Sequence, residues 1–408
     1  MRSPSIKPIL LQLHSIAGLA LALFLSVIAL SGAVLSFEDE IQAALNADRS
    51  HVAVAATPRL SPDELIARLQ AAGFGKVASV TLARDPSAAV PIRFARSDDA
   101  SRPSSVYVDP YDGRVLGHPV GEEFFATVRK LHRWLLLPGD AKGWGRPIGG
   151  SIAIGLIAML ITGLVLRWPH RPGSVKVWLK PNWRLRGRGL HRSLHAVLGT
   201  WAMLIYLVMV LTGLWWSFDW YKDGAAWLLS RAPAAAEPMP AKGQGKGLGN
   251  PTETQAPRGP GMAAESGGKR ETSATLPLDR VWSSFVQQQG ERFVTARLTL
   301  PAGGSLVRVR SWTTDATDGV RDEFRIDAVS GKIVSAELYA AKPLGDRILA
   351  RVLDIHRGNI LGWPGRLAFM LAALLMPLFA VTGVLLYLSR RRHKRMAQRP
   401  VGGLVAGE

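Results

Sequence analysis

The sequence predicts an α-helical integral membrane protein with four transmembrane helices and two periplasmic α+β domains, built as an internal duplication. Four uncharged stretches of 19 to 23 residues are each long enough to cross a hydrocarbon core of about 30 Å. They occupy 16–37, 148–166, 196–218 and 367–388. The long connections after the first and third stretches alternate apolar and polar residues, which is typical of strands. The first stretch is longer than the apolar region of a signal peptide, about 7–15 residues, so we interpret it as a retained helix.

The chain is basic as well as apolar, with 48% apolar residues and a formal net charge of +19. Lysines and arginines concentrate between the second and third stretches and after the fourth, and Arg2 and Lys7 precede the first. The positive-inside rule places these segments in the cytoplasm. We therefore expect both termini inside a bacterial inner membrane, and read the charge as a topology signal and not as a nucleic-acid footprint.

These assignments give a complete layout. Transmembrane helices are predicted at 9–37, 147–168, 191–219 and 365–389. Periplasmic domains are predicted at 38–120 and 220–342, each followed by a His-bearing outer helix, at 121–137 and 343–359. A basic cytoplasmic loop fills 169–190 and a basic tail 390–408. Within the second domain, 232–274 is rich in Pro, Gly, Ala and Ser and is predicted to be disordered.

The two outer segments resemble each other. The first contains a helix from Ser61 to Gly73 and ends in a predicted hairpin, Val106-Tyr-Val-Asp-Pro-Tyr-Asp-Gly113-Arg-Val-Leu. The second contains a helix near 278–289 and ends in Phe324-Arg-Ile-Asp-Ala-Val-Ser-Gly331-Lys-Ile-Val. Glycine supplies the positive φ that each turn requires. The spans repeat as well, because each carries a Ser/Thr-Gly pair near its end, at 31–32, 162–163, 212–213 and 382–383.

Four histidines fall at equivalent positions of this repeat. His14 and His195 each lie 18 residues before the glycine of their span, about 27 Å along a helix, so we place both at the cytoplasmic end. His132 and His356 lie too far from the next such glycine for a single helix, and a Pro-Gly pair interrupts each path. We place them at the outer surface.

One imidazole pair at each membrane face is what two b-type haems need as axial ligands. The chain has no cysteine, so thiolate ligands and c-type haem attachment are excluded. The predicted ligands are His14 and His195 for the inner haem and His132 and His356 for the outer haem. Arg133 and Arg357 follow the outer histidines and are candidate partners of haem propionates, with snorkelling to lipid headgroups as the alternative.

Several alternatives stay open at this point. Any one of the four histidines could simply sit in the headgroup region. His191 lies one helical turn before His195 and could be the ligand in its place. The Ser/Thr-Gly pairs are read as sites of close helix packing and not as chemical groups.

With these motifs in place, the chain resembles the PepSY-associated transmembrane family. The resemblance is carried by the Val106–Leu116 hairpin, Leu131-His132-Arg133-Trp134, His195 with Gly199, and the repeated Ser/Thr-Gly ends. It covers nearly the whole chain except 232–274. Family members include inner-membrane ferrisiderophore reductases, so the resemblance implies PepSY-like outer domains, two b-type haems and electron delivery to an Fe(III)-siderophore in the periplasm.

The function expected from the resemblance is therefore that of an oxidoreductase of the ferric reductase type, serving iron transport by one-electron transfer. No dinucleotide-binding fingerprint occurs, because the glycine-rich run at 243–249 neither follows a strand nor opens a helix. Electrons must then come from membrane quinol or a separate reductase. Two alternatives remain: a haem-b electron conduit to another periplasmic acceptor or quinone, and a non-enzymatic PepSY module anchored in the membrane for binding or regulation.

Overall fold

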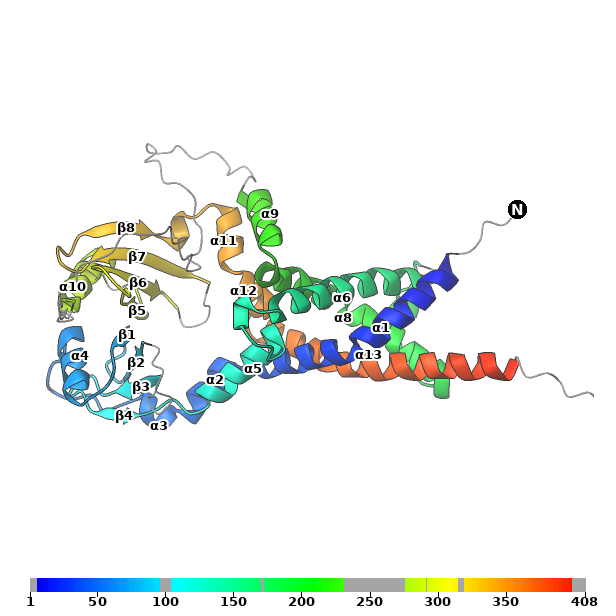
Figure 1. Ribbon diagram of the computed structural model, residues 1–408, viewed down its shortest axis with the longest axis horizontal. Helices are drawn as coiled ribbons and strands as arrows, with labels where there is room; N and C mark the ends of the chain where they lie inside the picture. The colour runs from blue at the N-terminus through cyan, green and yellow to red at the C-terminus, as the bar shows by residue number, and fades with distance from the viewer. Residues whose placement is uncertain are drawn as a thin grey trace, which may run out of the picture.

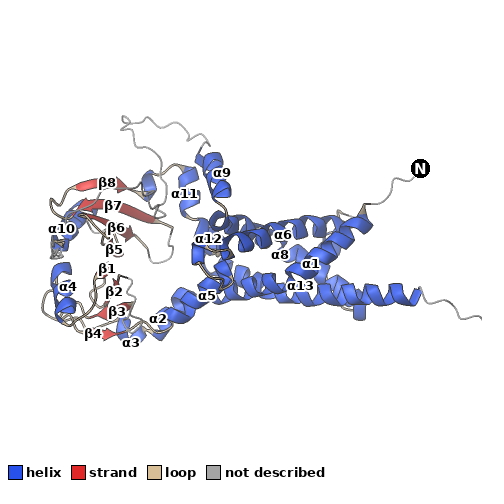
Figure 2. Ribbon diagram, viewed as in Figure 1, coloured by secondary structure: helices blue, strands red, loops and turns tan. Residues whose placement is uncertain are grey.

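The computed structural model describes residues 6–95, 104–169, 172–230, 276–290, 292–314 and 319–397. Four long helices form one end of the molecule and an antiparallel sheet with two short helices forms the other (Figure 1; Figure 2). The predicted insert at 232–274 lies outside the described residues.

The long helices are α1 (Lys7–Leu35), α6 (Gly145–Arg167), α8 (Gly187–Ser217) and α13 (Gly362–Ala397). Helix α1 packs against α6 and α13, and α8 packs against the same two, so the four close into a bundle. All four have the length and hydropathy of membrane spans, which confirms the prediction of four spans. A narrow core runs between them, formed by Ala202, Tyr206, Ala372 and Met376.

The outer surface of the bundle is apolar and exposed. Leu23, Ile161 and Leu204 expose 60% or more of their surface, although in water such side chains would be buried. Trp144 and Trp363, each within a few residues of a helix start, are 78% and 62% exposed. An apolar belt with tryptophans at its edge is the surface that a bilayer stabilises.

The sheet contains eight strands in the order β4-β3-β2-β1-β5-β6-β7-β8, all antiparallel. The first half comprises β1 (Val77–Ala83), β2 (Val90–Phe94), β3 (Ser105–Val108) and β4 (Val115–Gly117). The second half comprises β5 (Thr295–Thr299), β6 (Leu306–Trp312), β7 (Arg321–Asp327) and β8 (Ile333–Glu337). We predicted two domains, but β1 pairs with β5, so the two halves share one sheet.

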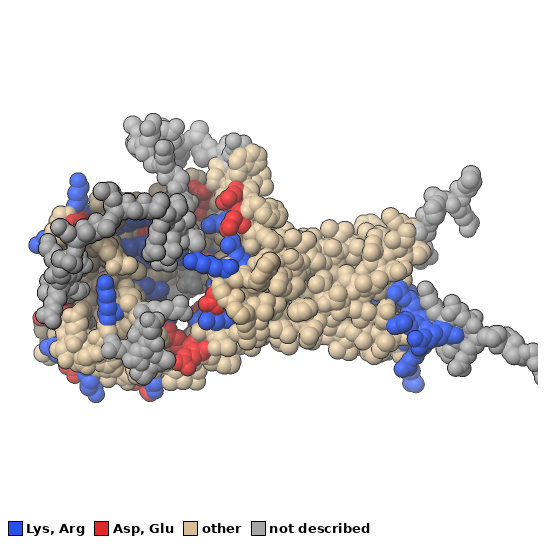
Figure 3. All heavy atoms as spheres, in the orientation of Figure 1, with Lys and Arg blue, Asp and Glu red and all other residues tan. Residues whose placement is uncertain are grey.

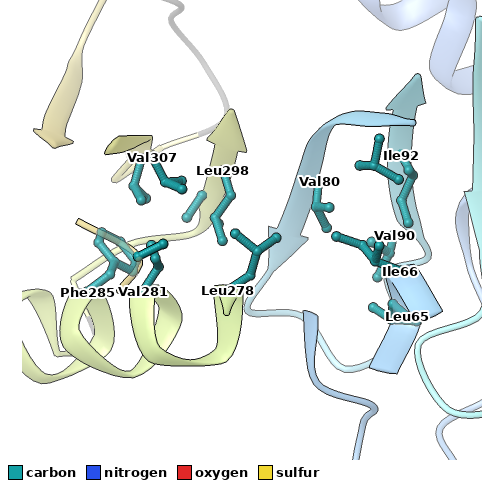
Figure 4. Packing of buried hydrophobic residues seen from close by; sticks show 14 of the residues in the cluster. Leu65, Ile66, Val80, Val90, Ile92, Leu278, Val281, Phe285, Leu298 and Val307 are labelled. Carbon is teal, nitrogen blue, oxygen red and sulfur yellow. The ribbon is translucent and has the colours of Figure 1, made fainter. Parts of the chain in front are cut away.

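One hydrophobic core lies between this sheet and the helices α4 (Pro62–Ala71) and α10 (Leu278–Gln289). Figure 4 shows Leu65 and Ile66 of α4 against the strands of the first half, and Leu278, Val281 and Phe285 of α10 against those of the second. Apolar residues alternate along the strands because successive side chains point to opposite faces. The other face of the sheet is left polar.

The starts of α4 and α10 cap each other. The backbone N–H of Leu278 donates to the Asp63 carboxylate at 2.8 Å, and the N–H of Asp63 donates to Asp279 at 2.9 Å. Helix starts carry unpaired N–H groups and a partial positive charge, so a carboxylate from the opposite helix stabilises each one. Ser61 and Glu64 add a capping box at the start of α4. These contacts join the two halves across the sheet.

Both predicted hairpins are present, as β3–β4 and β7–β8. Gly113 and Gly331 occupy equivalent turn positions with φ of 72° and 73°, a conformation that residues with a Cβ rarely adopt. In each turn the glycine N–H donates to the carbonyl of the aspartate four residues earlier, Asp109 or Asp327.

Short helices connect the sheet to the bundle. Helix α5 (Glu122–Trp134) follows β4 and packs on α1 and α6. After β8 the chain forms α11 (Leu344–Ala350) and α12 (Val352–His356), so the second His-bearing helix is broken into two pieces. The interruption before α13 lies at Gly358, with φ of 74°, whereas Pro364 sits in the first turn of α13, where a proline is tolerated.

The remaining helices lie at the two ends of the bundle. On the sheet side are α2 (Glu38–Leu45), α3 (Ala47–Ser50) and α9 (Asp219–Ser230), and α9 packs against α11. At the opposite end α7 (Val175–Leu179) connects α6 to α8. Three single-turn 3₁₀ helices complete the described chain, at Asp140–Lys142, Tyr339–Ala341 and Asn359–Leu361. Lys and Arg atoms gather at the end of the bundle far from the sheet (Figure 3).

Candidate functional site

The structure brings the four predicted histidines together in two pairs. His14 of α1 and His195 of α8 form the sheet-distal pair, with ring centroids 6.4 Å apart. His132 of α5 and His356 of α12 form the sheet-proximal pair, with centroids 6.2 Å apart. Each pair takes one imidazole from each half of the chain. The expected partnership of equivalent residues is therefore the one observed.

Each of the four rings makes the same hydrogen bond. Nδ1 of His14 lies 2.9 Å from the Thr162 hydroxyl, and Nδ1 of His195 lies 2.8 Å from that of Thr382. The sheet-proximal rings follow this pattern, since Nδ1 of His356 lies 2.8 Å from the Thr212 hydroxyl and that of His132 lies 3.3 Å from Ser31. Every hydroxyl belongs to one of the four Ser/Thr-Gly pairs.

These hydrogen bonds fix which ring nitrogen carries the proton. A hydroxyl has one proton, and Thr162, Thr212 and Thr382 each direct theirs to the backbone carbonyl four residues earlier. The hydroxyl must then accept from the ring, so Nδ1 is the protonated nitrogen. His132 shows this independently, because its Nδ1 lies 2.8 Å from the carbonyl oxygen of Ile28, which can only accept. Nε2 of every ring retains a free lone pair.

Each glycine of the four pairs lies beside one of the histidine rings. A Cβ on Gly32 would lie 2.9 Å from Cε1 of His132, and one on Gly163 would lie 3.3 Å from Cε1 of His14. At Gly213 and Gly383 the corresponding distances to His356 and His195 are 3.6 and 3.8 Å. A side chain at Gly32 would force the His132 ring to shift, and one at Gly163 would crowd His14, whereas a Cβ at Gly213 or Gly383 would make ordinary van der Waals contact. We read these Ser/Thr-Gly pairs as packing motifs, and that reading missed their contact with the histidines.

The sheet-distal pair opens into a cavity of about 730 Å³ between α1, α6, α8 and α13. Its walls are largely apolar. One of them is Phe379, whose ring makes an edge-to-face contact with the ring of His195, with centroids 5.4 Å apart. Five basic residues also line it, Lys7, Arg167, Arg188, Arg192 and Arg390. The cavity is thus an apolar chamber with cationic groups, suited to a flat apolar ligand that carries anionic substituents. His191 is half-buried on α8 but does not line this cavity.

Charged residues surround the sheet-proximal pair. Burial lowers the pKa of both His132 and His356, so both imidazoles are neutral. Arg357, directly after His356, forms ion pairs with Asp39 at 3.5 Å and Glu38 at 3.8 Å. Arg133 is exposed on α5, with its guanidinium 5.0 Å from the centre of the Trp134 ring. Arg133 and Arg357 are the two arginines predicted to bind haem propionates. Of these, Arg357 forms ion pairs with carboxylates of α2.

Glu38 ties the two His-bearing helices to each other. Its carboxylate, 5% exposed, contacts Arg129 of α5, one turn before His132, as well as Arg357 at the end of α12. Because a nearly buried carboxylate between two guanidiniums resists displacement, it holds the two helices at a fixed separation. Sequence reasoning overlooked Glu38, since a Glu-Asp-Glu run after a span reads as an ordinary polar boundary.

Together these features define a class, that of a four-span membrane protein with two imidazole pairs in its helical bundle and an antiparallel sheet at one end. The chain belongs to the family described as the PepSY-associated TM region, which matches residues 11–390. The match includes both imidazole pairs and all four Ser/Thr-Gly pairs. A comparison with curated proteins found no match.

The role of Glu38 can be tested with a neighbouring control. We expect Glu38→Gln to lower the free energy of unfolding by about 1–3 kcal/mol, because two partly buried arginines lose their shared counter-charge. Asp39→Asn removes a charge that is 69% exposed and should cost less than about 0.5 kcal/mol. Thermal and detergent-induced unfolding of the purified protein measure both. Equal losses in the two variants would contradict the assignment.

Proposed function

We propose that the protein is a transmembrane reductase that holds two b-type haems and passes electrons across the bacterial inner membrane to an Fe(III)-siderophore in the periplasm. In this proposal His14 and His195 hold the inner haem, and His132 and His356 hold the outer one. The observation that carries it is the arrangement of four imidazoles in two pairs. In each ring the proton on Nδ1 leaves the lone pair of Nε2 available. Family membership fits a protein of this type.

The spacing of each pair would allow its two imidazoles to hold one haem iron between them. The observed separations are 6.4 and 6.2 Å. A site with two imidazoles suits a metal that brings its other ligands with it, as haem iron does.

The surroundings of the sheet-distal pair fit the same cofactor. The cavity of about 730 Å³ lies in the range of sites that hold cofactors. Its apolar walls suit a macrocycle, and Arg167, Arg188 and Arg390 suit the two propionates.

The residues around each pair position the ligands. When bound, a b-type haem supplies one-electron transfer, with a potential set by its axial ligands and their hydrogen bonds. The hydroxyls of Thr162, Thr382, Thr212 and Ser31 orient the imidazoles and raise their basicity through Nδ1. Helix α8 supports both ends, since it carries His195 and, 17 residues or about 26 Å further along, Thr212. This span compares with a hydrocarbon core of about 30 Å.

Charge supports the proposed orientation, and the chemistry of iron is compatible with the substrate that the resemblance implies. The basic end of the bundle is cytoplasmic by the positive-inside rule, which puts both termini inside and the sheet in the periplasm. One electron converts Fe(III) to Fe(II), which hard oxygen donors hold less firmly, so iron is released without breaking the siderophore. The electron comes from a quinol or a separate reductase on the other side, which is oxidised by one electron per iron.

Haem content is the first test. The purified protein should show a reduced-minus-oxidised b-type spectrum, and an Ala substitution of any one of the four histidines should remove about half of the absorbance, because each iron loses one of two protein ligands. His191→Ala serves as the matched control and should retain both haems. Colourless protein from haem-replete cells would refute the proposal and favour a non-enzymatic PepSY module.

The hydroxyl partners give a second test. Thr382→Val keeps the side-chain shape but removes the acceptor of the His195 Nδ1 proton, so haem retention at the inner site should fall by about 10- to 100-fold. Thr200→Val is the control, because Thr200 lines the same cavity and its hydroxyl donates to the Ala196 carbonyl. Haem loss is followed by transfer to an apo-protein acceptor. Retention as firm in Thr382→Val as in Thr200→Val would contradict the tautomer argument.

The substrate is tested by reoxidation. After chemical reduction and removal of the reductant, stopped-flow absorbance should show fast reoxidation by a ferric siderophore and no reaction with its gallium complex. Reoxidation by quinone alone would favour the alternative function, an electron conduit to another acceptor.

A further inference from the structure

Helix α9 leaves the bundle at the point where a membrane span ends. The span helix α8 ends at Ser217, and Phe218 is extended, with φ of −134° and ψ of 127°, so the chain changes direction before α9 begins at Asp219. In Figure 1, α9 runs crosswise to the long helices at the sheet end of the bundle. The helix therefore starts at the level where the bundle leaves the membrane on the sheet side.

Helix α9 is held in this position at both of its ends. At its start, Arg146 of α6 donates to the carbonyl of Trp216 at 3.0 Å and forms an ion pair with Asp219. At its end, the hydroxyl of Ser230 donates to Asp346 of α11 at 3.0 Å. Between these ends α9 packs along α11. The protein thus sets the orientation of α9 and decides which of its faces are exposed.

The surface of α9 divides into three faces. Successive residues are about 100° apart around a helix, so the residues of one face recur every three or four positions. The half-buried residues, at 221, 222, 225, 226 and 229, form the face that packs against the protein. The exposed residues form the other two faces, which differ in chemistry. They are a polar strip of Asp219, Asp223 and Ser230 and an apolar strip of Trp220, Gly224, Trp227 and Leu228.

The apolar strip is directed away from the sheet. Helix α11, against which α9 packs, lies on the sheet side of α9 (Figure 1). Around the helix the apolar strip is centred farther from the packing face than the polar strip is, by the same spacing of about 100° per residue. Trp220 and Leu228 expose 64% and 66% of their surface. The strip is thus an exposed apolar surface on the membrane side of the helix.

The apolar strip continues a lipid contact that the bundle already makes. Trp144 and Trp363 mark the sheet-side starts of α6 and α13, and Trp220 follows the sheet-side end of α8. The ring of Trp220 also stacks on that of Phe218, with centroids 5.7 Å apart. Tryptophan collects in the headgroup layer because its ring is apolar at one end and carries an N–H at the other. Three spans therefore have an exposed tryptophan at the same end of the bundle.

We propose that α9 is an interfacial helix, which lies in the headgroup layer of the leaflet on the sheet side and inserts its apolar strip about 5–10 Å toward the acyl chains. Its partner is the lipid of the protein's own membrane. The polar strip stays in water, and the packing face supports α11. Residues 219–230 thus belong to the membrane surface and not to an outer domain beginning at 220, whichever cofactor the bundle carries.

The interfacial position of α9 also supports His356. Ser230 at the end of α9 bonds to Asp346 of α11, and α11 is followed after one residue by α12, which ends at His356. Lipid contact along α9 therefore fixes the height of α12 relative to the membrane surface. This support adds to the ion pair between Glu38 and Arg357, which acts on α12 from the other side.

The depth of α9 can be measured with single cysteines, because the chain has none of its own. Leu228→Cys tests the apolar strip, and two controls of similar exposure bracket it. Leu23→Cys lies within the span α1 at 69% exposure, and Val329→Cys lies in the β7–β8 turn at 60%. Each variant receives a nitroxide spin label in lipid nanodiscs, and its collisions with oxygen, which concentrates in lipid, and with a water-soluble nickel chelate are measured.

The ratio of oxygen to nickel collisions should be severalfold higher at position 228 than at 329 and should approach the ratio at 23. A ratio at 228 equal to that at 329 would place the strip in water and overturn the proposal. A label at 228 that is shielded from both reagents would mean that protein covers the strip, either another segment of this chain or a second copy. That result overturns the proposal as well.

Stability gives a second measurement with an opposite sign for the two possibilities. Trp220→Gln with Leu228→Gln should melt at a lower temperature than the wild type in nanodiscs, because two apolar side chains lose their contact with lipid. Val329→Gln is the matched control and should leave the melting temperature unchanged, since its side chain is in water. A double variant that melts at or above the wild-type temperature would contradict burial in lipid. If the double variant does not fold, the label at 228 still decides the position of the strip.

Discussion

The organisation of the bundle depends on one hydrogen bond, made four times, between an imidazole Nδ1 and a Ser or Thr hydroxyl on another helix. Each bond crosses between elements distant in sequence, α1 to α6, α5 to α1, α8 to α13 and α12 to α8. Because the hydroxyl already donates to its own helix, it sets the ring tautomer as well as the ring position. At Gly32 and Gly163 the neighbouring glycine also leaves the ring space that a Cβ would crowd. Packing, tautomer and the direction of Nε2 are thus fixed by one two-residue motif.

The sheet and the bundle are coupled at the sheet-proximal pair. Each His-bearing helix follows an edge strand of the sheet, β4 before α5 and β8 before α11 and α12, so the sheet sets where these helices enter the bundle. Pairing of β1 with β5 gives the two halves one core, and the reciprocal caps of Asp63 and Asp279 lock the helices above it. Glu38 then joins α5 to α12 from the bundle side. The 6.2 Å separation of His132 and His356 is therefore supported from both ends.

The sequence was informative where a local pattern has one physical solution. Apolar length identified the four spans, and the Gly113 and Gly331 turns identified the hairpins, because only glycine tolerates that φ at no steric cost. Repeat spacing paired the four histidines correctly, since equivalent positions of two similar halves meet in the bundle. The sequence could not predict contacts between elements that share no pattern. These are the β1–β5 pairing, the ion pairs of Glu38, and the hydrogen bonds between His14 and Thr162 and between His195 and Thr382. The Ser and Thr hydroxyls do recur at the same place in all four spans. This repeat matches that of the four histidines, whose Nδ1–H groups they accept hydrogen bonds from.

The positive charge of the chain acts differently at the two ends of the molecule. At the end far from the sheet, arginines lie where water and lipid headgroups can solvate them at little cost. On the sheet, Arg308 and Arg325 face each other across neighbouring strands with Arg310 beside them, and no membrane rule calls for that arrangement. Glu323 pairs with Arg310 at 3.0 Å and offsets part of this charge.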